Sequence, residues 1–186
     1  MQYTLPGTVL SCEEEAFRTA FSVIQPILTA TGGLTLSQVV DMTGLPASTI
    51  QNWIKRGWVA SPASKRYGER QLMRILLINM LRSSIQLEQI QVLMRYVNGK
   101  VDDESDDAIA DRDLYNMLCA ILFKLSRTIP DEPTIRLIIE QELASCKTVL
   151  PADKQKLATA LYIMTLGYLS AMLQEQMNKQ LGSITP

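Results

Sequence analysis

The sequence predicts an all-α fold, mainly helical, that carries one small β-hairpin. Apolar residues recur at helical spacing along most of the chain, and short extended runs occur at residues 58–67. Of the 186 residues, 47% are apolar and 20% are charged, which is typical of a globular chain rather than a disordered one. This length is enough for one sizeable hydrophobic core or two small ones.

Two short helices joined by a glycine turn are predicted in the first third of the chain. The first covers residues 36–42 and turns at Gly44, and the second covers residues 47–56 and stops at Gly57. The order of helix, glycine turn and helix is the outline of a helix-turn-helix.

The second of these helices has two distinct faces. On a wheel of 100° per residue, Trp53 and Ile54 lie within about 60° of Ile50, so these side chains are predicted to be buried. The opposite face carries small, amide and basic side chains, namely Ser48, Gln51, Asn52 and Lys55. A second helix that is polar and basic outside indicates a recognition helix for DNA. An ordinary amphipathic helix pair is the alternative that these residues alone leave open.

A small β-hairpin is predicted directly after the helix pair. Residues 58–60 and 65–67 are short extended runs, and residues 61–64 form the turn between them. Lys65 and Arg66 place positive charge where the hairpin would meet a phosphate backbone. We therefore expect a wing that grips DNA beside the helix pair.

Two further helices follow this wing. Residues 69–81 carry apolar side chains at helical spacing, and a second helix is predicted from residue 85 to residue 97. The order of helix-turn-helix, wing and two helices resembles the DNA-binding domain of the MerR family of transcription regulators. The resemblance covers about a third of the chain. The whole length is similar to an uncharacterised bacterial family with such a domain near its N-terminus.

The resemblance to the MerR family holds at individual positions. The matching residues are Leu36, Val40 and Gly44 of the first helix, Thr49, Ile50 and Lys55 of the second, Gly57 and Trp58 after it, Pro62, Arg66 and Tyr67 of the wing, and residues 85–90 of the later helix. The family usually has Arg-Tyr-Tyr where this chain has Gln51, Asn52 and Trp53. This difference changes the expected base contacts, and the amides of Asn and Gln are suited to adenine.

The resemblance and the polar face together imply a set of residues that contact double-stranded DNA. Those expected to face the major groove are Ser48, Thr49, Gln51, Asn52, Lys55 and Arg56. Those expected to hold phosphates are Lys65, Arg66, Tyr67 and Arg70.

Charge is unevenly distributed along the chain. The net charge is −1, yet residues 31–100 hold nine Lys or Arg and three Asp or Glu, a balance of +6. Residues 101–186 hold eight Lys or Arg and thirteen Asp or Glu, a balance of −5. Residues 1–30 hold one Lys or Arg and three Asp or Glu, a balance of −2. A basic block between acidic flanks favours a nucleic-acid-binding domain joined to other segments, and a merely solvated basic face is the alternative.

Four segments follow from these patterns: an N-terminal helical extension (1–30), a winged helix-turn-helix domain (31–100), an acidic linker (101–108) and a C-terminal three-helix domain (109–186). Residues 1–10 are expected to be a loose tail. The helix of the extension is expected to begin at a capping box of Ser11 and Glu14 and to kink or end at Pro26. The linker lacks the Gly and the Glu that an EF-hand calcium loop requires.

The C-terminal segment predicts a bundle of three helices. The first runs from Ile109 and stops before Pro130, the second starts at residue 131, and the third follows residue 153. Residues 157–174 contain no charge, and this run predicts burial in a bundle or a subunit interface. A membrane span and a ligand-lined helix are the alternatives. The expected seam consists of Leu157, Leu161, Met164, Tyr168 and Met172.

These patterns predict a sequence-specific DNA-binding transcription regulator that forms a homodimer through its C-terminal helices and has no membrane partner. A small-molecule or protein effector is compatible with residues 109–186. The alternative is a non-enzymatic protein–protein interaction module built on a helix-turn-helix scaffold. The chain has no histidine and three widely separated cysteines, so we expect no enzyme activity, no metal site and no cofactor. Reduced cysteines and the lack of a signal peptide predict a cytoplasmic protein.

Overall fold

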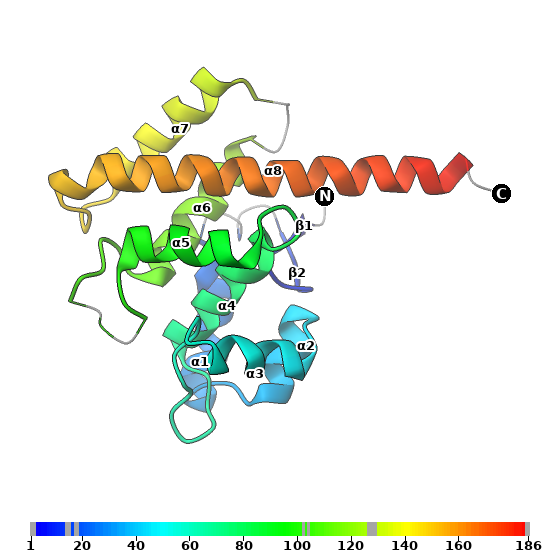
Figure 1. Cartoon of the computed structure of the whole chain (residues 1–186), viewed down its shortest axis with the longest axis vertical. Helices are drawn as coiled ribbons and strands as arrows, with labels where there is room; N and C mark the ends of the chain where they lie inside the picture. The colour runs from blue at the N-terminus through cyan, green and yellow to red at the C-terminus, as the bar shows by residue number, and fades with distance from the viewer. Residues whose placement is uncertain are drawn as a thin grey trace.

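The computed structural model describes residues 3–13, 16, 19–101, 103, 105–125 and 130–184. In these residues the fold is mainly helical with one small two-stranded sheet, so the predicted fold class is confirmed (Figure 1). The strands are β1 (Tyr3–Thr4) and β2 (Ser11–Cys12). The helices are α1 (Ala20–Thr31), α2 (Leu36–Thr43), α3 (Ala47–Lys55), α4 (Glu69–Leu81), α5 (Leu87–Asn98), α6 (Asp111–Leu125), α7 (Glu132–Ser145), the short 3-10 helix η2 (Pro151–Asp153) and α8 (Lys154–Ile184).

The N-terminal segment, described from Tyr3 onward, packs on the body of the protein, so the prediction of a loose tail is wrong. β1 pairs antiparallel with β2. Between the two strands Leu5 is fully buried, and the Tyr115 hydroxyl donates a hydrogen bond to the carbonyl oxygen of Pro6 at 2.8 Å. Apolar burial and a buried hydrogen bond, both made with distant parts of the chain, hold this segment in place.

The first helix begins later than predicted. α1 starts at Ala20, whereas the predicted capping box combined Ser11 with Glu14. Ser11 lies in β2, and Glu14 lies outside the described residues. Strand pairing therefore takes the place of the predicted first turn.

The prediction was that Pro26 would kink or end this helix, and the structure places Pro26 inside α1, so the helix does not end there. The helix buries Phe21, Ile24 and Leu28 and packs against α6, where the Phe21 N–H donates a hydrogen bond to the side-chain oxygen of Asn116 at 2.9 Å. Pro26 is on the exposed side, where it removes a single helical hydrogen bond. The packing of the buried face outweighs that loss.

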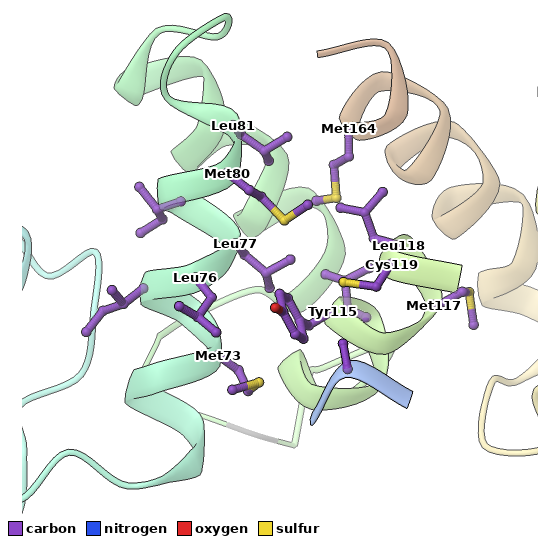
Figure 2. Packing of buried hydrophobic residues seen from close by; sticks show 14 of the residues in the cluster. Met73, Leu76, Leu77, Met80, Leu81, Tyr115, Met117, Leu118, Cys119 and Met164 are labelled. Carbon is purple, nitrogen blue, oxygen red and sulfur yellow. The ribbon is translucent and has the colours of Figure 1, made fainter. Parts of the chain in front are cut away.

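One hydrophobic core connects the predicted DNA-binding segment with the predicted C-terminal segment. α4 is central to it, because residues 72–78 are all at most 4% exposed and the helix packs against α2, α5, α6 and α8. Figure 2 shows side chains of α4 meeting Tyr115 and Leu118 of α6 and Met164 of α8. The acidic residues 101–108 therefore do not separate two independently packed cores.

A buried polar cluster joins α4, α5 and α6. The Arg74 guanidinium donates to the Asp111 carboxylate with an Nε–Oδ2 distance of 2.7 Å, and both side chains are only 4% exposed. The side-chain amide of Asn98 donates to the other carboxylate oxygen at 3.0 Å. One carboxylate at the start of α6 thus fixes the positions of three helices.

Asp107 precedes α6 and carries a raised pKa. Its Oδ1 atom is buried and has no hydrogen-bond partner among the described residues. Burial, and next the negative charge of Asp111, raise the pKa of Asp107 to about 6. The folded state therefore holds this proton more tightly than the unfolded chain does, where the pKa of Asp is about 3.9.

Replacing Asp107 by asparagine is expected to stabilise the protein at pH 7. In the wild type, the contribution of Asp107 to the free energy of unfolding falls as pH rises from about 4 to about 6, because the folded state holds the proton more tightly and must release it. Solvent screening at this partly exposed side chain limits the gain to about 1 kcal/mol. Urea unfolding at several pH values measures the effect, with the exposed Asp41→Asn as control. The same pH dependence in wild type and Asp107→Asn would contradict the prediction.

The three predicted C-terminal helices are present as α6, α7 and α8. The predicted seam of α8 is buried at Leu157, Leu161 and Met164 and half-buried at Tyr168 and Met172. The described residues after Met172 are all exposed, and this half of α8 projects beyond the body of the protein (Figure 1). By length and composition, Pro151–Ile184 could cross a membrane, and 39% of its most apolar window is buried.

Candidate nucleic-acid interface

α2 is fixed at both ends by its own sequence. Thr35 and Gln38 form a capping box, in which the Thr35 hydroxyl accepts from the Gln38 N–H and the Gln38 side-chain oxygen accepts from the Thr35 N–H at 2.9 Å. Gly44 ends the helix with a φ of 68°, a left-handed conformation that glycine adopts without strain. α2 therefore begins and ends close to the predicted residues, and its glycine turn leads into α3.

α3 exposes the predicted polar face and buries the predicted apolar one. Ile50 and Trp53 are at most 1% exposed, and Ile54 is half-buried. The exposed candidates on the helix and its C-cap are Ser48, Gln51, Asn52, Lys55 and Arg56, and Thr49 is half-buried. Burial of the Trp53 ring fixes how the helix is rotated about its own axis, so the amides of Gln51 and Asn52 remain at the surface.

The predicted hairpin wing is a loop with one tight turn rather than a pair of strands. Ser64 and Lys65 both have positive φ, 48° and 61°, and the Arg66 N–H donates to the Ala63 carbonyl at 2.8 Å. Positive φ at both central residues is typical of a two-residue hairpin turn. Beyond it, no strand covers the predicted runs, and Trp58 and Val59 of the first run are buried in the core.

Tyr67 belongs to the core and is not available to hold a phosphate, contrary to the prediction. Its side chain is 4% exposed, and burial raises its pKa. Its backbone exchanges two hydrogen bonds with that of Leu34, at 2.8 and 2.9 Å. Tyr67 therefore attaches the end of the loop to the segment that precedes α2.

Arg70, another predicted phosphate contact, interacts with charges of the chain itself. It is half-buried in the first turn of α4, and its charge interacts with Asp103 and Asp107 of the acidic segment. That segment returns toward α5, where the Ala108 N–H donates to the Val97 carbonyl at 3.3 Å. The phosphate contact predicted for Arg70 stays a prediction.

The remaining basic candidates lie in α3 and in the loop that follows it. Lys55, Lys65 and Arg66 are exposed. Arg66 also donates to the carbonyl of Gly33 at 3.0 Å, which holds its guanidinium beside the loop. Figure 1 places α3 and this loop on the far side of the molecule from α8. Positive charge is therefore available next to the amides of α3.

Two contacts at the end of α3 were not predicted from the sequence. The Arg56 guanidinium lies 4.9 Å from the centroid of the Trp58 ring. It also lies 3.5 Å from the carboxylate of Glu88 in the first turn of α5. Both groups of this ion pair are exposed, so DNA can compete for Arg56 at small cost. The contact between Arg56 and Trp58 could have been predicted, because the two residues are only two positions apart in the sequence. The ion pair with Glu88 could not, because the tertiary fold brings α5 next to α3.

Other kinds of site have less support in the described residues. They contain no group of three or more His, Cys, Asp or Glu that could hold a metal ion. An apolar groove of about 710 Å³ lies between α5 and α8, and a more polar hollow of about 850 Å³ is bordered by α6 and α7. An effector that binds the C-terminal helices stays a prediction.

Comparison with known proteins places the chain in a family without assigning it an activity. Residues 24–118, slightly more than half of the chain, match the family described as a domain of unknown function (DUF1836). The chain is similar to the uncharacterized protein YkrK of Bacillus subtilis (strain 168), with 26% identity over 117 residues. Those residues are 61% of this chain and 49% of YkrK, so the chain spans about half the length of that relative. No solved structure matches. The family match begins in α1 and ends in α6, across the predicted boundary at residues 101–108, and the chain belongs to the DUF1836 family.

Proposed function

We propose that the protein is a sequence-specific DNA-binding transcription regulator. The observation that carries the proposal is α3, in which Ile50 and Trp53 hold the helix from one side and an uninterrupted polar face remains exposed on the other. The second helix of a helix-turn-helix lies in the major groove and contacts base edges with such a face. Side-chain amides pair with adenine through two hydrogen bonds, so Gln51 and Asn52 are the proposed base readers.

The proposed phosphate contacts lie at the end of this helix and in the loop that follows it. Lys55 is in its last turn, and Lys65 and Arg66 are exposed in the loop that follows. Phosphate contacts position a protein on the duplex, whereas base contacts supply specificity. A recognition helix this short reads few base pairs, so the regulator is proposed to act as a homodimer on two half-sites.

Selection of bound sequences from random duplex DNA, at two salt concentrations, tests the proposal. A regulator is expected to enrich a two-fold symmetric site. Binding is expected to weaken steeply as salt rises, because phosphate contacts release counterions. Weak binding without enrichment and without salt dependence would refute DNA recognition.

Two substitutions separate base reading from phosphate contact. Asn52→Ala is expected to weaken the free energy of DNA binding by about 1–3 kcal/mol and to relax the sequence preference at one base position. Lys65→Gln is expected to weaken binding to all DNA sequences alike. It is also expected to reduce the slope of log affinity against log salt concentration by about 1. Lys65 is preferred to Arg66 for this test, because the Arg66 guanidinium also donates to Gly33 and its loss would disturb the loop.

Lys179→Gln is the matched control for the phosphate contact. It removes the same charge from an exposed position of α8, on the far side of the molecule from α3 (Figure 1). DNA affinity and salt slope are expected to stay at the wild-type values. An equal loss of affinity in Lys65→Gln and Lys179→Gln would indicate non-specific attraction rather than contact through the loop.

A protein-interaction module on the same scaffold is the second candidate. The exposed apolar side chains around the groove between α5 and α8 favour it, since contiguous apolar surface marks interaction sites. It predicts that DNA affinity is weak and insensitive to salt, so the selection experiment also decides between the two functions.

A further inference from the structure

An apolar stripe runs along the face of α8 that points away from the core. It consists of Ile163, Leu166, Leu173, Met177, Leu181 and Ile184, whose side chains are between 42% and 77% exposed. Successive members are three, four or seven residues apart, so they lie within about 80° of one another around the helix. Ser170 occupies the middle of the stripe. Residues at this spacing form the seam between paired helices.

One part of the apolar stripe borders a groove and the other part projects. The groove between α5 and α8 has a volume of about 710 Å³, and its lining includes Val92, Tyr96, Ile163 and Leu166. From Leu173 onward the helix continues past the body (Figure 1), over a length of about 17 Å. The chain therefore exposes both an apolar groove and an apolar helix end to water.

We infer that α8 pairs antiparallel with α8 of a second copy of this chain, and that the projecting half of each helix lies along the α5–α8 groove of the other. A two-fold axis at Ser170 sets Met177 against Ile163 of the second copy, and Leu173 within one residue of Leu166. Leu173 and Met177 then meet apolar residues of the second copy, with a small serine where the helices cross. Leu181 and Ile184 lie opposite Thr159 and Lys156. Because the same surface serves both copies, the contact closes as a dimer. This inference stands independently of DNA binding.

The area available agrees with a stable dimer. Eight side chains about half exposed, namely the apolar stripe with Val92 and Tyr96, offer roughly 50 Å² of apolar surface each, or about 400 Å² per copy. Interfaces are about 60% apolar, so the whole contact amounts to roughly 700 Å² per copy. Stable interfaces bury about 600–1,000 Å² per partner.

The distribution of charge also suits an antiparallel pair. The two charged residues of the projecting half, Glu175 and Lys179, lie outside the apolar stripe. Lys154 and Lys156 in the first turn of α8 would lie next to the C-terminal end of α8 of the second copy, where a positive charge is favourable. The Lys156 ammonium already lies 5.9 Å from the centroid of the Tyr96 ring, at the groove.

The mass of the full chain in solution tests the inference. Sedimentation is expected to give twice the 20.8 kDa chain mass for the wild type. Leu173→Glu combined with Met177→Glu is expected to give the chain mass. These side chains are exposed, so folding, followed by circular dichroism, is expected to be unchanged. The control Gln176→Glu with Ser183→Glu adds the same charge to another face of the helix and is expected to remain a dimer. A monomeric wild type at about 100 μM, or a dimeric stripe variant, would overturn the inference.

Cross-linking tests the direction of the pair. In a Cys146→Ser background, Ser170→Cys is expected to form a disulfide between two copies, because the two-fold axis brings this position onto itself. Met177→Cys is expected to form none, because the two copies of this residue are about 20 Å apart, and a disulfide needs Cα atoms within about 7 Å. Cross-linking at both positions would show parallel helices. Cross-linking at neither would show that another surface forms the dimer. Either result rejects the antiparallel pair.

Discussion

Replacing Asp111 by alanine is expected to lower the free energy of unfolding by about 3–5 kcal/mol. The Arg74 guanidinium, 4% exposed, would lose the carboxylate that it contacts at 2.7 Å and would remain charged and buried. The side-chain amide of Asn98 would lose its acceptor at the same time. A buried charge without its partner is far more costly than the loss of an exposed ion pair.

Urea unfolding followed by circular dichroism measures this loss. Asp113→Ala is the matched control, because Asp113 pairs with the partly exposed Arg112 and its removal is expected to cost less than about 1 kcal/mol. Arg74→Leu combined with Asp111→Leu is expected to be more stable than Asp111→Ala, since it removes the charge together with its partner. Equal stability of Asp111→Ala and Asp113→Ala would show that the buried pair does not stabilise the fold.

Replacing Trp53 by alanine is expected to lower the free energy of unfolding by about 3–5 kcal/mol. Trp53 is 1% exposed and is the largest side chain that holds α3 against the body. Its removal leaves a cavity where α3 packs against the body. Trp53→Phe, which keeps an aromatic ring, is expected to cost less.

Asn52→Ala is the matched control for Trp53, since the two residues are adjacent and Asn52 is exposed. Its effect on stability is expected to stay within about 0.5 kcal/mol, while its effect on base preference is the one described above. Thermal unfolding of the two variants separates the anchoring of α3 from recognition by α3. A Trp53→Ala protein as stable as the wild type would mean that this ring does not hold the helix.

The helices from α2 to α5 could be predicted nearly to the residue, because local signals set their ends. Thr35 caps α2, Gly44 ends it, and Gly57 with a φ of 70° follows α3. The exposure of Gln51 and Asn52 followed from helical periodicity alone, since the buried face of α3 is so strongly apolar. These parts of the site depend on neighbours in sequence.

The errors occurred where distant residues decide the structure. The segment around Pro6 is held by Tyr115, which lies more than one hundred positions later, and no local pattern records that contact. Tyr67 was placed on the surface because its neighbours are basic, but its pairing with Leu34 takes it into the core.

The sharing of α4 between the two predicted halves limits how this protein can change shape. α4 buries side chains toward α2 on one side and toward α6 and α8 on the others. A rigid-body rotation or translation of one half relative to the other would therefore disrupt the packing of α4. The two halves are expected to unfold together rather than one at a time. A chain cut at residue 100 would expose the buried face of α4 and would not fold as a separate module. A molecule that displaced α6 or α8 would move α4 directly, and α4 would move the loop that follows α3. The helical body is therefore expected to move as one unit.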